Sequence, residues 1–327
     1  MENTSKDNKS GEDHDVSSPL PNQNTAKNAV TNGDSTSKTV PGISQKHFPS
    51  KHNKGWLKLC FSNAVDRPRL DSFFDPANKN KIDPSEYVLV RETAFFDPAL
   101  NDHTAFLEDQ DGKIRTVTLA YHLNDPINPP KTGHDFTEIG TTLTDINGFQ
   151  AGVLIIAACS MKEWWLSPPN RIFAAMVKDN NIPSQKTFQK LGWDKVNDDH
   201  LADEIGAAAD QTLQNQAQTF VQKKQSTDPN DAQTWHIMTP YSLCMQAQIL
   251  IHFMDAGELF NRKTGERIDI DLSCLDTIGL TRSRLEALAN GQLNKNILEN
   301  IDPNAPTSNC PAKDNNADQN SAPPPAP

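Results

Sequence analysis

The sequence has little of what marks several common classes of protein. Its 327 residues include only five cysteines, none of them in a CxxC pair. A disulfide framework or a cysteine zinc site is therefore not indicated, and a reducing compartment such as the cytoplasm is favoured. No apolar run reaches the roughly 18 residues that a membrane span needs, and no apolar stretch follows the first basic residues as in a secretory signal.

An excess of positive charge is also missing. The formal net charge is −11, and no basic stripe of the kind that binds a phosphate backbone is present. We therefore expect a protein that binds neither nucleic acid nor membrane. The nine histidines show no metal-ligand spacing, and neither a Gly-x-Ser-x-Gly motif nor a Walker loop occurs, so no metal or serine-hydrolase site is predicted.

Both ends of the chain are poor in apolar residues. Residues 1–54 are rich in Ser, Thr, Asn, Asp and Lys, and residues 302–327 are rich in Pro and Asn. Because neither segment can bury enough surface to offset its chain entropy, we expect two disordered tails. The polar N-terminal tail is also compatible with a signal for secretion into a host cell, and the sequence leaves that alternative open.

Strand patterns come first in the region between the tails. Runs with strand character occupy residues 55–61, 87–92, 104–108, 114–121 and 136–144. Gly112 lies in a short polar turn between two of these runs and indicates a hairpin. This order predicts an antiparallel meander. The apolar stretch 152–165 that follows is long enough for a buried helix, which Pro168 and Pro169 end.

A strand and a capped helix follow this buried helix. Residues 171–177 form a short apolar run, Asn181 is a good N-cap, Pro183 lies in the first turn, and Gly192 can adopt the left-handed conformation that ends a helix. Farther on, residues 201–224, 235–238, 242–254, 258–272 and 281–291 indicate, in order, a helix, two core-forming pieces, a hairpin and a capped helix.

The segment from Asn181 to Trp193 carries a resemblance. Its frame, Asn-x-x-Ser-x-x-x-Phe-x-Lys-x-Gly-Trp, resembles a late strand-helix-strand segment of the GNAT superfamily of acyl-CoA-dependent N-acyltransferases, in which Asn-x-x-(Ala/Ser)-x-x-x-Tyr-x-Lys-x-Gly-Phe is usual. The resemblance covers roughly residues 56–196. It implies an α/β (α+β) fold with a mixed, mostly antiparallel sheet and flanking helices, in which strands 136–144 and 171–177 run parallel.

The resemblance and the composition together divide the chain into four parts. These are a polar tail (1–54), a GNAT-like acyl-CoA-binding core (55–197), a helical and β extension packed on that core (198–301), and a second tail (302–327).

A loop that holds the acyl-CoA pyrophosphate is expected before the buried helix. In the GNAT family a (Gln/Arg)-x-x-Gly-x-(Gly/Ala) loop offers backbone N–H groups to this anion at a helix N-terminus. The matching residues are Asn147, Gly148, Phe149, Gln150, Ala151 and Gly152. Asn147 replaces the usual Arg or Gln, and Gln150 replaces a central Gly. Gln150 either obstructs the phosphate or donates a hydrogen bond to it, and the alternative is an ordinary strand-to-helix turn.

The resemblance also implies the chemistry and its residues. Acetyl-CoA, or another acyl-CoA, would be the co-substrate, no metal would be needed, and an unidentified amine acceptor would attack the thioester directly. By position in the motifs, the backbone of Thr142, Leu143 and Thr144 would line the acyl and pantetheine arm, and the cofactor-binding residues would further include Asn181, Ser184 and Phe188. Glu138 and, second, His134 are the candidate bases. Glu138 is alternatively a solvent-facing strand residue or part of an ion pair, and His134 is alternatively an exposed loop residue.

One substitution puts turnover in question. The family's usual acid for the departing thiolate is a Tyr, and Phe188 stands in its place. The three tyrosines, Tyr87, Tyr121 and Tyr241, lie outside the motif, so the acid is water, another side chain or absent. Two functions follow: an N-acyltransferase, or a catalytically weak or inactive module that binds acyl-CoA or another protein.

Overall fold

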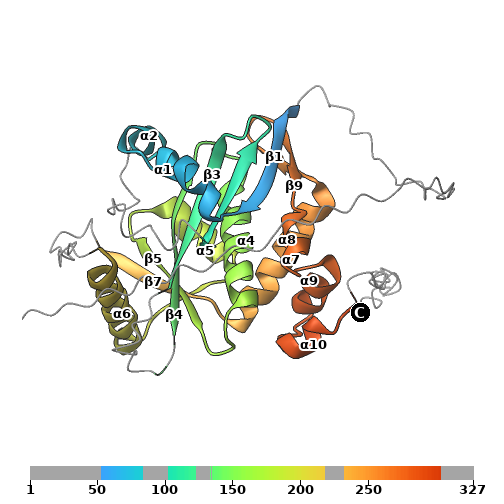
Figure 1. Ribbon diagram of the computed structural model, residues 1–327. Coiled ribbons are helices and arrows are strands. Elements are labelled where there is room, and N and C mark those ends of the chain that lie inside the picture. Colours follow the sequence, from blue (N-terminus) through green and yellow to red (C-terminus); the bar gives the residue numbers. More distant parts are fainter. Residues whose placement is uncertain (1–52, 84–101, 123–132, 134, 218–231, 303–327) are drawn as a thin grey trace, which may run out of the picture. The chain divides into compact units, whose positions relative to one another are not determined.

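The computed structural model describes residues 53–83, 102–122, 133, 135–217 and 232–302, which all belong to one compact unit, Pro49–Pro327 (Figure 1). Residues 53 and 54, which were predicted to end the first tail, lie in a strand, and residue 302 is also described; the rest of both predicted tails, the strand at 87–92 and His134 fall outside these residues. Within the described ranges no helix is long and apolar enough to cross a membrane.

A mixed sheet lies at the centre of the fold. The described part contains nine strands, which lie in the order β6 (Asp194–Lys195), β7 (Gln233–Ile237), β5 (Ile172–Lys178), β4 (Phe136–Thr144), β3 (Ile114–His122), β2 (Thr104–Asp109), β1 (Asn53–Phe61), β9 (Arg267–Asp271) and β8 (Glu258–Phe260). Neighbours are antiparallel except for β4 with β5 and β1 with β9. The predicted mixed, mostly antiparallel sheet is confirmed.

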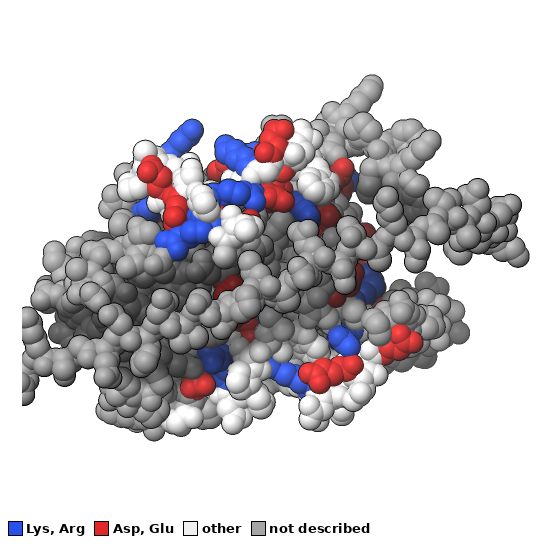
Figure 2. Space-filling view, viewed as in Figure 1, with Lys and Arg blue, Asp and Glu red and all other residues white. Residues whose placement is uncertain are grey.

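Helices cover both faces of the sheet. One face packs against α4 (Ala151–Leu166), α5 (Ile182–Lys190), α7 (Pro240–Ala256), α8 (Cys274–Thr277), α9 (Arg282–Ala289) and α10 (Lys295–Glu299). The other face packs against α1 (Arg67–Phe73), α2 (Pro76–Ile82) and α6 (Asp199–Ala217), with the 3₁₀ turn η1 (Ala64–Asp66) before α1. Around α1 the charges alternate in sign, as in the ion pair between Arg69 and Asp66, and Figure 2 shows positive and negative side chains interspersed there.

Helix α4 is buried along nearly its whole length. Every residue from Val153 to Glu163 is buried, which is why the sequence there shows a continuous apolar run rather than an amphipathic pattern. In the chain α4 connects β4 to β5, and its packing holds these two strands in place.

The parallel pair β4 and β5 stays together only at its beginning. Residues Phe136–Glu138 pair with Ile172–Ala174, and beyond Glu138 the two strands part. Strand β5 continues to Lys178 by pairing with β7, which approaches from the opposite side. The predicted parallel pair with a buried helix between its strands in the chain is therefore confirmed.

The region after residue 197 contributes strands to the same sheet. Strand β7 lies between β5 and β6, and β9 extends the sheet beyond β1. The sheet thus runs across the division that composition suggests at 197/198, and that division stays a prediction.

Candidate active site

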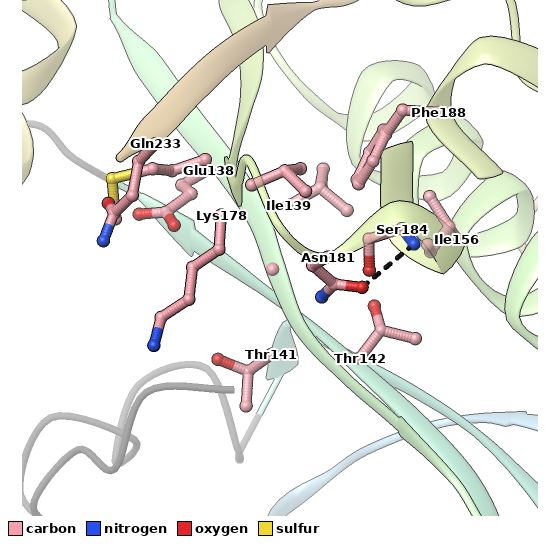
Figure 3. Close-up of a pocket in the computed structure, with 13 residues that line it drawn as sticks. Glu138, Ile139, Thr141, Thr142, Ile156, Lys178, Asn181, Ser184, Phe188 and Gln233 are labelled. Atoms are coloured by element: carbon pink, nitrogen blue, oxygen red, sulfur yellow. Dashed lines mark hydrogen bonds between the residues drawn. The ribbon is translucent and has the colours of Figure 1, made fainter. Parts of the chain in front are cut away.

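A cleft opens where β4 and β5 part. It has a volume of about 70 Å3 and is lined by residues of β4, α4, β5, α5 and β7. Its lining includes Glu138, Thr141, Thr142, Lys178, Asn181, Ser184, Phe188 and Gln233. Figure 3 shows two groups: Glu138, Thr141, Lys178 and Gln233 lie on the left, while Thr142, Asn181, Ser184 and Phe188 lie on the right. Of the predicted site residues, the structure thus brings Glu138, Thr142, Asn181, Ser184 and Phe188 together.

Glu138 lies in the wall of this cleft. It is the last residue of β4 that pairs with β5, and only 3% of it is exposed, so it is not a solvent-facing strand residue, whereas the ion-pair alternative stays open. Gly140 leaves space beside it, because a Cβ there would lie 3.3 Å from Glu138 Oε1 and 3.7 Å from the Tyr121 ring. A buried carboxylate in a cleft is well placed to accept a proton from a bound group.

A β-bulge follows Glu138 at the point where the strands part. The β3–β4 register shifts between the pairs Leu119 with Gly140 and Val117 with Leu143, so β4 carries one extra residue there. Thr141 has φ +50°, a left-handed conformation that is unusual for a β-branched residue and costs about 1–3 kcal/mol. Its hydroxyl accepts a 2.6 Å hydrogen bond from Tyr121 OH.

The capped helix α5 forms the opposite side of the cleft. Asn181 Oδ1 accepts a hydrogen bond from Ser184 N–H at 3.2 Å, and Gly192 has φ +75°, so the predicted N-cap and helix end are both confirmed. Phe188 is buried, and its ring lies 5.1 Å from Trp193 and 5.6 Å from His236. Phe188 therefore belongs to the core and to the cleft wall at once.

The loop predicted to bind pyrophosphate leads directly into α4. Gln150 is the N-cap residue with φ +63° and makes no side-chain cap. Within the described ranges, the N–H groups of Ala151 and Gly152 have no hydrogen-bond acceptor, so two donors at the positive end of the helix dipole remain for an anion.

The Asn261 side chain occupies the space beside Gly148 in this loop. Gly148 has φ +87°, and a Cβ there would lie 2.7 Å from Nδ2 of Asn261, which belongs to the turn between β8 and β9. Asn147 and Phe149 line a second cleft, shared with Asn261 and Asp145. These loop residues do not line the cleft between β4 and β5.

Two other predicted residues also lie outside that cleft. The Leu143 side chain is buried in the core on the α1 and α6 face. The Thr144 hydroxyl pairs with Thr116 at 2.8 Å and accepts the N–H of Ile146. Of the three β4 residues expected along the acyl and pantetheine arm, only Thr142 lines the cleft.

A second polar cluster, which the sequence did not reveal, lies near the carboxyl end of α4. His103 Nδ1 and His122 Nε2 lie 3.1 and 3.0 Å from Glu163 Oε2. These three ligand-type atoms lie within 4.8 Å of one another. Burial alone would raise the pKa of Glu163, but hydrogen bonds from both histidines and the charge of Lys162 hold that pKa far below its ordinary value. Because the three residues are far apart in the chain, no spacing motif announces them.

The surroundings of this cluster do not suit a metal. Arg171 Nη1, which can only donate, lies 2.9 Å from His122 Nδ1, so Nδ1 accepts and Nε2 carries the proton that faces Glu163. A metal would need the Nε2 lone pair and an acceptor beside Nδ1. Burial also lowers the pKa of His122, which favours the neutral ring that this arrangement requires.

Three residues of the cleft carried no signal in the sequence. Thr141, Lys178 and Gln233 line it because of the bulge in β4 and the insertion of β7 beside β5. Neither feature follows from a local pattern.

Comparison with known proteins gives neighbours in structure only. No protein-family model and no curated protein matches the sequence. The chain is similar to N-acetylglutamate synthase from Neisseria gonorrhoeae, solved with coenzyme A and N-acetyl-glutamate (11% identity, 57% of this chain, 35% of that chain, TM-score 0.35). It is also similar to an N-acetyltransferase from Staphylococcus aureus Mu50 (10% identity, 55% of this chain, 94% of that chain, TM-score 0.35).

A third neighbour is an acetyltransferase of the GNAT family from Streptococcus pneumoniae (13% identity, 43% of this chain, 85% of that chain, TM-score 0.32). The chain spans about a third of the Neisseria gonorrhoeae synthase. These identities and TM-scores are too low to transfer a substrate or a mechanism. These neighbours in structure are acetyltransferases with low sequence identity to the chain. The motif at Asn181–Trp193 resembles the same class of enzyme.

Proposed function

We propose that the protein is an acyl-CoA-dependent N-acyltransferase that transfers an acyl group directly to an amine. The observation that carries this proposal is the cleft between the parting strands β4 and β5. It combines a buried carboxylate, Glu138, with the capped helix α5 on its opposite side. Strand β4 then leads to the N–H groups of Ala151 and Gly152 at the start of α4, which have no acceptor among the described residues.

The α4 N-terminus, the cleft and Glu138 have separate roles in this reaction. The N–H groups of Ala151 and Gly152 bind the pyrophosphate, because a helix N-terminus favours an anion. The acyl thioester lies in the cleft, where the amine nitrogen attacks its carbonyl carbon and the C–S bond breaks as the C–N bond forms. Glu138 takes the proton that the nitrogen loses. The products are an amide and free CoA.

A second candidate function is an acyl-CoA-binding module without turnover. Two observations favour it: Phe188 has no proton to give, and Asn261 closes one side of the loop at Gly148. Such a module would bind acyl-CoA and release no thiol.

Calorimetric titration with acetyl-CoA and an assay of thiol release with a panel of amines separate these functions. We expect binding and amine-dependent thiol release. Glu138→Gln should lower kcat by about a hundredfold or more and leave acetyl-CoA binding unchanged. Glu204→Gln is the matched control, because Glu204 is also a buried carboxylate but lies in α6, away from the cleft.

Three results would count against the proposal in different ways. Binding without thiol release from any amine selects the module. Absence of binding removes both functions. Equal kcat in wild type and Glu138→Gln keeps the transferase but removes Glu138 as its base.

A further inference from the structure

Thr141 is held in a conformation that its residue type disfavours. It is β-branched, yet it has a φ of +50°, and among the described residues only Gln150 is another non-glycine with positive φ. Strain of this kind persists where surrounding contacts enforce it, and it is found preferentially at functional sites. Here the contact is the hydrogen bond from Tyr121 OH to Thr141 Oγ1.

This hydrogen bond leaves the Thr141 hydroxyl with a proton to donate. Tyr121 is buried at 3% exposure, and its O–H points at Thr141 Oγ1 over 2.6 Å. A threonine hydroxyl that accepts one hydrogen bond still has its own O–H. No acceptor for that O–H is found among the residues that the structure describes, and Thr141 lines the cleft between β4 and β5.

Glu138 and Tyr121 converge on the same place. They lie opposite each other in the β3–β4 register, and both approach Gly140, where a Cβ would lie 3.3 Å from the carboxylate and 3.7 Å from the phenol ring. The missing side chain at Gly140 lets the Glu138 carboxylate and the Tyr121 ring approach each other, and the Tyr121 hydroxyl reaches Thr141, which lines the cleft. Figure 3 shows Glu138 and Thr141 on the left of the cleft, with the Lys178 side chain between them.

We propose that Tyr121 and Thr141 form a two-hydroxyl relay that delivers a proton to the departing thiolate of the acyl-CoA. The proposal rests on the transferase function above. Phe188 cannot act as the acid, because it has no proton to give. In the relay the acid comes instead from β3 and β4, which lie outside the α5 motif. Thr141 is then a catalytic residue, and Tyr121 acts through it as a positioning residue and proton source.

The step balances as follows. The amine nitrogen forms a bond to the carbonyl carbon, the carbon–sulfur bond breaks with its electron pair going to sulfur, and Glu138 holds the proton from nitrogen. Thr141 O–H gives its proton to sulfur, Tyr121 O–H replaces it on Thr141, and Tyr121 recovers a proton from Glu138 or from water. No oxidant, reductant or further reactant is required.

The test measures kcat, KM for acetyl-CoA, and acetyl-CoA affinity in the full chain. Thr141→Val and Tyr121→Phe remove one hydroxyl each, and both should lower kcat on the order of a hundredfold with affinity unchanged. Thr141→Ser keeps the hydroxyl and should restore kcat to within a few-fold of wild type. Thr116→Val is the matched control, because its hydroxyl also bridges β3 and β4, at Thr144, but lies outside the cleft.

The outcomes separate the two proposals. Absence of thiol release in wild type overturns the transferase and the relay together. Release in wild type with unchanged kcat in Thr141→Val and Tyr121→Phe overturns the relay alone. If kcat falls in Thr141→Val and Thr141→Ser does not restore it, the relay is also overturned, since a merely structural role of Thr141 would then explain the loss. If Thr141→Val does not fold, Tyr121→Phe decides.

Discussion

The two ends of α4 are built in opposite ways. At the amino end, Gln150 makes no side-chain cap, and the N–H groups of Ala151 and Gly152 have no acceptor in the described part of the chain. At the carboxyl end, Lys295 donates to the carbonyls of Trp164 and Ser167, and Glu163 accepts hydrogen bonds from two histidines and Lys162. In the described part of the chain, the amino end thus has two donors without an acceptor, whereas the groups at the carboxyl end are hydrogen-bonded by other parts of the chain.

This difference predicts that the carboxyl end of α4 contributes to stability and that its amino end contributes to ligand binding. A buried charge with several partners stabilises a fold only while all partners remain, so its removal is costly. Backbone donors without partners add little to stability, but they are prearranged for an anion. We therefore expect mutations at the carboxyl end to change the free energy of unfolding, and mutations at the amino end to change affinity for a phosphate.

The largest effect is expected at Glu163. Glu163→Gln removes the negative charge that faces Lys162, His103 and His122, and leaves a buried ammonium without its counter-charge. The free energy of unfolding should fall by about 3–5 kcal/mol, measured by urea unfolding. Glu286→Gln breaks a more exposed ion pair with Arg282 and should cost about 1 kcal/mol or less. Equal losses in the two variants would contradict the special role of the carboxyl end.

The next effect is expected at Gln150. Gln150→Gly relieves the left-handed backbone and should raise the free energy of unfolding by about 1 kcal/mol. If the Gln150 amide donates to the pyrophosphate, the same change should weaken acetyl-CoA binding about ten- to a hundredfold, as measured by calorimetry. Gln150→Asn serves as the control, because asparagine keeps a side-chain amide and adopts positive φ more readily than most other residues. Tighter binding in Gln150→Gly would mean that the side chain obstructs the phosphate.

A smaller effect is the pH dependence of the free energy of unfolding that arises from His122 and Glu163 at the carboxyl end of α4. The pKa of His122 lies below its ordinary 6.5 and that of Glu163 below its ordinary 4.5, so the unfolded chain takes up protons at a higher pH than the folded one. Stability should therefore decline as the pH falls below about 6.5, and more steeply below about 4.5. Urea unfolding between pH 8 and pH 4 measures this. Glu163→Gln should flatten the lower part of the curve, and an unchanged curve in that variant would show that other groups cause it.

The smallest effect is expected from the tails, which belong to neither end of α4. Because their composition predicts little packing, a chain limited to residues 53–302 should melt within about 5 °C of the full chain. A larger shift, corresponding to roughly 2 kcal/mol or more, would show that one tail is docked on the folded part. Thermal unfolding with each tail removed separately would identify which.

Local patterns predicted much of this fold. The turn at Gly112, the buried run of α4, the cap at Asn181 and the left-handed Gly192 each depend on neighbouring residues, and the structure has all four. The helix after Thr281 was also predicted, although the Thr281 side chain makes no cap.

Features that depend on distant residues were not predictable. Nothing in residues 233–237 says that they will enter the sheet between β5 and β6, and nothing near Thr141 announces a bulge. The cluster of His103, His122 and Glu163 joins three separate elements, so it became visible only in three dimensions. In the candidate site, the α5 motif located one side of the cleft, whereas the hydroxyls on the other side depend on the pairing of β3 with β4.

The parallel pairing of β1 with β9 has a consequence for how the chain folds during synthesis. Strand β1 is the first described strand, and among the described residues its outer edge is covered by Arg267–Asp271, near the end of the described chain. Until that segment is synthesised, this edge offers unpaired backbone groups to other chains, which is the usual starting point of aggregation. A ribosome that stalls before residue 267 would therefore release a chain with an open sheet edge, and such a chain should depend on chaperones far more than the complete one.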